Sequence, residues 1–203
     1  MSEAREPWMV LITAMGKEVQ KTAALEGLDP GFRQRLLVRV IFSTFEGYAF
    51  HLRQRALEIG QANDYEFSKT AFENLTEQKE VTKDDGTVEM KQFFLGSLKG
   101  LKFSIAIFAK VLGVPEPPSP KAGDLEAGFS VRDRLTHPKR AASFNISESE
   151  AQVMVRLGGW FSTVVQWYSD TERAYIRQVS EKISASIAAR RAEIEAELKK
   201  DEE

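Results

Sequence analysis

The spacing of apolar residues constrains this chain more than any other feature of its sequence. Between residues 29 and 60 they recur three and four positions apart, which is the repeat of one face of an α-helix. The positions are Leu36, Leu37, Val40, Ile41, Phe45, Tyr48, Leu52, Ala56 and Ile59. A face this wide has to be covered by other helices, so the spacing predicts a helix inside a bundle.

Further segments show the same helical spacing. One begins with a proline, which favours a first helical turn, and one carries a phenylalanine-rich stripe that we expect in the core. The segments are residues 7–26, 63–78 and 93–113. Almost no strand pattern is present, and the sequence therefore predicts an all-α, up-and-down helical bundle with short loops.

Helix boundaries can be placed in the second half of the chain. Asp124 is a suitable cap for a helix that Pro138 ends at His137, because a proline disfavours helical geometry in the residue before it. Ser147 and Glu150 have the spacing of a capping box, which predicts the start of another helix. The segment between residues 130 and 142 therefore contains the last turn of a helix.

Two segments depart from the helical pattern. Asp85 and Gly86 are flanked by Val81 and Val88 and can supply the positive-φ pair of a tight turn, so we expect a small β-hairpin near residues 80–91. The segment PEPPSPKAGD contains four prolines and predicts a loop within the domain.

The end of the chain, from about residue 170 to residue 203, predicts an extended charged helix with a narrow apolar stripe. The stripe consists of Val179, Ile183, Ile187, Ile194 and Leu198. Such a stripe is typical of a contact between two helices. Its partner is either a second copy or the chain's own bundle. We expect one domain over residues 1–203.

Composition excludes several classes of function. The chain has no cysteine and two histidines, which rules out disulfides, thiolate chemistry and a zinc site. Its formal net charge of −2 is not that of a general nucleic-acid binder, so a site for a polyanion has to be local. No phosphate-binding glycine loop, signal peptide or membrane span is evident, and we expect a cytoplasmic protein without a cofactor or metal.

The stretch SVRDRLTHPKRAA, residues 130–142, combines two kinds of chemistry. Arg132 has a permanent charge and a fork of donors suited to phosphate, whereas His137 can exchange a proton near neutral pH. On a regular helix the two side chains would point about 140° apart, so they converge only if the helix unwinds before Pro138. The structural alternative is a basic helix end, where each cation offsets the helix dipole by about 0.3–1 kcal/mol.

Arg132, Asp133 and His137 form a pattern in which an Arg is followed directly by Asn, Asp or His, and four to six residues lie between that Arg and a later His. This pattern, at the end of a late helix, resembles the signature of the HEPN superfamily. The resemblance is specific over residues 130–139, and it implies a bundle of four to five helices. Many members of that superfamily resemble metal-independent endoribonucleases that work as dimers. Some members paired with a nucleotidyltransferase carry a tyrosine where this chain has Lys139, which argues against that form of regulation.

The resemblance implies roles for individual residues. His137 would act as general base or general acid, Arg132 would hold the scissile phosphate, and Asp133 would orient one of them or pair with a lysine. A second copy would complete the site, since one histidine cannot hold both proton roles in one turnover. The basic side chains of Arg134, Lys139 and Arg140 would bind RNA phosphates, or would be solvated surface charges.

Glu46 lies in the strongly apolar segment between Phe45 and Tyr48, where an unpaired carboxylate would be costly. It would pair across the bundle with Arg132 and orient it, or with another arginine or solvent. The other histidine, His51, is expected to be structural or at the surface.

The resemblance therefore implies a homodimeric endoribonuclease acting on RNA, with a toxin or defence role and an antitoxin partner. The alternative is a non-catalytic helical module that binds a nucleotide, an RNA or a protein partner.

Overall fold

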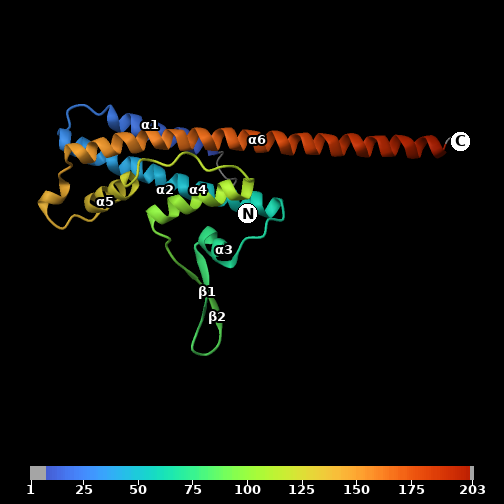
Figure 1. Ribbon diagram of the computed structural model, residues 1–203, viewed down its shortest axis with the longest axis horizontal. Coiled ribbons are helices and arrows are strands. Elements are labelled where there is room, and N and C mark those ends of the chain that lie inside the picture. Colours follow the sequence, from blue (N-terminus) through green and yellow to red (C-terminus); the bar gives the residue numbers. More distant parts are fainter. Residues whose placement is uncertain (1–7, 202–203) are drawn as a thin grey trace. The chain divides into compact units, whose positions relative to one another are not determined.

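The computed structural model describes residues 8–201, with side chains at residue 10 and residues 13–195. Within this range the chain is mostly helical, which confirms the all-α prediction, and it contains one two-stranded sheet (Figure 1). The elements are α1 (Trp8–Ala23), α2 (Pro30–Ala62), α3 (Lys69–Thr76), β1 (Gln78–Thr82), β2 (Val88–Gln92), α4 (Ser97–Leu112), α5 (Asp124–Thr136), η1 (Ala141–Phe144) and α6 (Glu148–Asp201).

The chain divides into two compact units, Met1–Thr163 and Val164–Glu203, and the boundary falls inside α6. The first unit contains all elements up to the first part of α6. The second unit is the remainder of that helix. Pro7, the expected first residue of the first helix, and the side chain of Leu198 lie outside the described residues.

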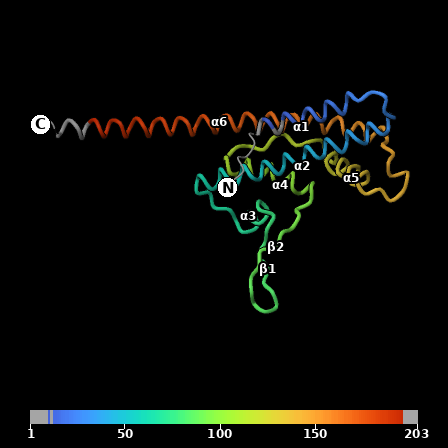
Figure 2. Tube along the Cα trace, turned by 180° about the vertical axis from the view of Figure 1, so that it is seen from behind, coloured from blue at the N-terminus to red at the C-terminus, as the bar shows by residue number. Residues whose placement is uncertain are grey.

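Helix α2 is the centre of the first unit, and α4 lies beside it (Figure 1 and Figure 2). The predicted apolar face of α2 is buried from Phe45 onward, with Phe45 and Leu52 at most 1% exposed. Before Phe45 the prediction was wrong in detail, because Leu36, Leu37, Val40 and Ile41 are half-buried and the buried side chains are Val38 and Phe42. The ring of Phe42 packs edge-on against Phe129 of α5, with ring centroids 4.7 Å apart. Each such side chain contributes roughly 1.5–3 kcal/mol through burial, so this face holds the helices together.

The predicted ends of α5 and α6 are confirmed, with one correction. Helix α5 ends at Thr136 with His137 as its C-cap, and Ser147 and Glu150 form a capping box before α6. Asp124, however, is not a cap, because Gly123 takes the N-cap position with a φ of 81°. The carboxylate of Asp124 instead accepts two hydrogen bonds of 2.8 Å from Arg156.

The expected hairpin is present as strands β1 and β2, paired antiparallel, and it extends away from α2 and α4 in Figure 1. The expected turn is different, because Gly86 has a φ of 80° but Asp85 has no positive φ. The connection is longer than a two-residue turn, and Lys83 donates to the carbonyl of Thr87 at 2.8 Å. The carboxylate of Asp85 accepts hydrogen bonds from Thr87.

Two other predictions were wrong in detail. The helix expected over residues 63–78 covers only Lys69–Thr76, because Asn63 caps α2 and Asp64 takes a φ of 52°. Phe94 is 75% exposed and not in the core, since α4 begins only after Gly96 and the helical spacing does not apply before it. No helix within residues 8–201 is both long and apolar enough to cross a membrane.

Candidate functional site

The best-organised cluster of the predicted site surrounds Arg132 on α5. Its guanidinium donates to Glu46 of α2 through Nη2 and to Asp133 through Nη1, the latter at 2.8 Å. Glu46 also accepts a hydrogen bond of 2.6 Å from the hydroxyl of Ser97 at the start of α4. The structure therefore contains the pair between Glu46 and Arg132 that the sequence left open, and Ser97 joins it.

This cluster borders an open groove of about 690 Å³ between the start of α4 and α5. The side chain of Arg132 is 22% exposed, so solvent and a bound anion can still reach it. Lys99 also lines the groove, and no ion pair of Lys99 occurs among the described residues. Sequence reasoning missed Ser97 and Lys99, because nothing in the local pattern indicates that the start of α4 faces α5.

His137 occupies the position where α5 stops. Its backbone has left the helical range, with φ −122° and ψ 63°, and its N–H donates to the carbonyl of Asp133 at 2.9 Å. The residue is exposed, and its imidazole makes no hydrogen bond or ion pair within the part of the chain that the structure describes. His137 does not line the groove that Arg132 borders.

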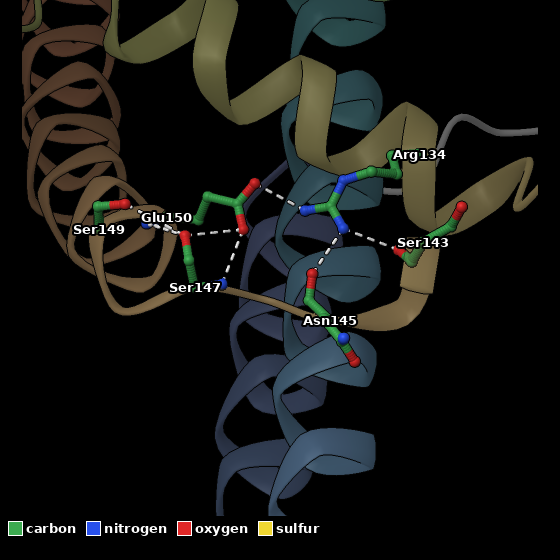
Figure 3. Close-up of polar contacts among 6 residues, drawn as sticks. All are labelled: Arg134, Ser143, Asn145, Ser147, Ser149 and Glu150. Carbon is green, nitrogen blue, oxygen red and sulfur yellow. Dashed lines mark hydrogen bonds and ion pairs between the residues drawn. The ribbon is translucent and has the colours of Figure 1, made fainter. Parts of the chain in front are cut away.

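Arg134 holds the loop that follows α5 (Figure 3). Its guanidinium donates to the carbonyls of Ser143 at 2.8 Å and Asn145 at 2.5 Å, and to the carboxylate of Glu150 at 2.7 Å. In Figure 3 the side chain points into the space between η1 and the capping box of α6. These contacts show a structural role for Arg134, and its role as a phosphate ligand stays a prediction.

Glu150 connects this network to the start of α6. Burial alone would raise the pKa of Glu150, but hydrogen bonds from Ser147 and the charge of Arg134 outweigh it and leave the pKa below its ordinary value. The carboxylate is therefore ionised near neutral pH. Through its contact with Arg134, Glu150 joins the start of α6 to the loop that precedes it.

Lys139 and Arg140 are both exposed and follow directly after the proline that ends α5. Neither forms an ion pair among the residues that the structure describes. Two solvated cations next to His137 suit the binding of phosphates, and they suit an ordinary surface equally well. The described side chains include no group of three or more His, Asp or Glu residues placed to hold a metal ion.

Comparison of this chain with family models, with curated proteins and with solved structures finds no match.

Proposed function

We propose that this protein is a metal-independent endoribonuclease of HEPN type. The observation that supports the proposal best is the state of Arg132, which two carboxylates hold in place at the edge of an open groove. An arginine fixed in this way can receive a phosphate without first losing much side-chain freedom. On the same helix, the exposed imidazole of His137 follows at the point where the helix ends.

In the proposed reaction, a neutral imidazole takes the proton of a ribose 2′-hydroxyl. The 2′-oxygen then attacks the adjacent phosphorus, and the bond from phosphorus to the 5′-oxygen breaks. A protonated imidazole donates the proton that the leaving 5′-oxygen needs. Arg132 neutralises the charge that develops on the non-bridging oxygens. The products are a 2′,3′-cyclic phosphate and a 5′-hydroxyl.

The reaction needs one neutral and one protonated imidazole, and each chain supplies His137 once. A homodimer would add the second imidazole and would bring the histidine of one copy to the arginine of the other. In a single chain His137 does not line the groove of Arg132, which is consistent with such a composite site. Lys139 and Arg140 would bind flanking phosphates, and Asp133 and Glu46 would keep Arg132 oriented.

The biological setting follows from the resemblance to the HEPN superfamily. A ribonuclease of this type would act as a toxin or a defence effector in the cytoplasm, and an antitoxin protein would restrain it. Single-stranded RNA or the loops of tRNA are the substrates in this proposal.

A second candidate function is a non-catalytic module that binds a nucleotide, an RNA or a protein. It is favoured by the same ion pairs, because both terminal nitrogens of Arg132 already have carboxylate partners. In that case Arg132 would serve the packing of α5 against α2, and no RNA would be cleaved.

The test is cleavage of single-stranded RNA by the purified protein in EDTA, with the product ends mapped. We expect cyclic phosphate ends from the wild type and a rate lower by about 10²–10⁴-fold for His137→Ala, the usual contribution of a general acid or base. The matched control is His51→Gln, which changes the other histidine and is expected to cleave as the wild type does. Unchanged cleavage by His137→Ala would overturn the assignment, and no cleavage of any RNA would favour the binding module.

A further inference from the structure

The second unit exposes a row of large apolar side chains to water. Ile176, Ile183, Ile187 and Ile194 of α6 are 56%, 54%, 52% and 43% exposed. Ile176 and Ile187 are eleven positions apart, and so are Ile183 and Ile194. An eleven-residue repeat has about 3.67 residues per turn, so the row follows a nearly straight helix without drifting around it. We call the row from Ile176 to Ile194 the isoleucine stripe.

We propose that a second copy of this chain packs on the isoleucine stripe in the antiparallel direction, with Ile183 of one copy against Ile187 of the other. The stripe is symmetric about position 185, which an antiparallel contact between identical helices requires. Ile176 then lies level with Ile194 of the second copy. The contact removes the exposed isoleucines from water on both copies.

The charges beside the stripe favour this direction. Successive residues of a helix are turned by about 100°, which places Arg177 and Glu195 on the same flank of the stripe. In an antiparallel pair each flank faces the same flank of the second helix. Arg177 then lies within about two residues of the level of Glu195 of the second copy. The two-fold symmetry makes this opposite-charge pair twice.

A parallel pair would place like charges together. Arg190 belongs to the stripe by its position, eleven residues after Val179. In a parallel pair it would lie opposite Arg190 of the second copy, inside the contact, where like charges repel. In the antiparallel pair it lies beside Val179, whose surface its aliphatic stem can cover. Within its own chain Arg190 also binds Glu193 at 2.8 Å.

This inference goes beyond the proposed function and does not depend on it. The contact is confined to residues of the second unit and places residue 163 of one copy roughly 66 Å along the helix axis from residue 163 of the other. The pairing of Arg132 with His137 of another copy would therefore be a separate contact between copies. It would hold if the chain cleaves no RNA, and it could fail while cleavage succeeds.

The absence of cysteine from the chain permits a direct test, since one introduced cysteine is then unique. The full-length variants Ile187→Cys, Ile176→Cys and Gln178→Cys are treated with a short bismaleimide cross-linker and analysed on denaturing gels. The antiparallel contact predicts a covalent dimer for Ile187→Cys. It predicts none for Ile176→Cys, whose two copies would be about 27 Å apart, or for the control Gln178→Cys on the opposite face. Equal dimer yields at Ile176 and Ile187 would show a parallel pair, and no dimer at either would overturn the contact.

A charge exchange tests the pairing of the flanks in the Ile187→Cys background. Glu195→Arg places two arginines together and is expected to weaken the dimer about threefold to tenfold, as the loss of exposed ion pairs does. Adding Arg177→Glu restores opposite charges and should restore the cross-linked fraction. A double variant that stays as weak as Glu195→Arg alone contradicts the antiparallel pairing.

Discussion

Isoleucine is buried in the first unit of the molecule and exposed to water in the second. In the first unit Ile59 of α2 is 2% exposed, whereas Ile187 in the second unit is 52% exposed. Both residues belong to helical rows of apolar side chains. The row on α2 is wide and is covered by other helices of its own unit, but the isoleucine stripe is narrow and is flanked by charges. The width of an apolar face therefore separates residues that fold the chain from residues that we infer to join two chains.

Truncation of one large apolar side chain in each unit is the strongest test of this comparison. Phe42→Ala in the first unit should lower the free energy of unfolding by about 3–5 kcal/mol, because the ring is completely buried against Phe45 and Phe129. Urea unfolding followed by tryptophan fluorescence measures the loss.

The matched variant in the second unit is Ile183→Ala, which removes a side chain that is 54% exposed. It should change the free energy of unfolding of the first unit by no more than about 0.5 kcal/mol, as ordinary surface substitutions do. If both variants lower this free energy of unfolding equally, the division between a folded core and an exposed stripe is wrong.

Acid is expected to lower the stability of the first unit by a smaller amount. The hydrogen bonds from Arg156 hold the pKa of Asp124 below its ordinary value, and the pKa of Glu150 is also lowered. Because both pKa values are lower in the folded chain, the unfolded chain binds more protons in acid. The stabilisation is therefore complete above the unfolded pKa values of about 4 and is lost as the pH falls through the folded ones.

Unfolding measured between pH 7 and pH 3 gives this dependence directly. Asp124→Asn should unfold more easily at pH 7 and show a shallower loss of stability in acid than the wild type. An unchanged slope in the variant would mean that Asp124 does not contribute to the acid sensitivity of the first unit.

Local sequence signals were sufficient for several features of the fold. The capping box of Ser147 and Glu150, the end of α5 at His137 and the hairpin all depend on residues close together in the chain. The errors arose where a residue far away in the chain, or a backbone conformation, decides which contacts a side chain makes. Asp124 binds Arg156, which lies 32 positions away, and a glycine with positive φ takes the cap position.

The candidate site was only partly predictable for the same reason. The residues of the motif could be named, but the pair of Arg132 with Glu46 joins positions 86 apart and stayed one of two alternatives. The structural contacts of Arg134 were not foreseen, since they depend on how the loop after α5 turns back toward α6. Periodicity and spacing thus name candidate residues, and the packing of helices decides what each of them contacts.

The central claim is that two copies of the chain complete one catalytic site, and mixing of subunits tests it most directly. Wild-type chains and His137→Ala chains are co-expressed at known ratios, and RNA cleavage in EDTA is measured per wild-type chain. A composite site predicts a rate of about one half at equal amounts and about one tenth at a ninefold excess of the variant, because mixed dimers lack one imidazole. A rate per wild-type chain that stays constant at every ratio would contradict the account, since each chain would then carry its own complete site.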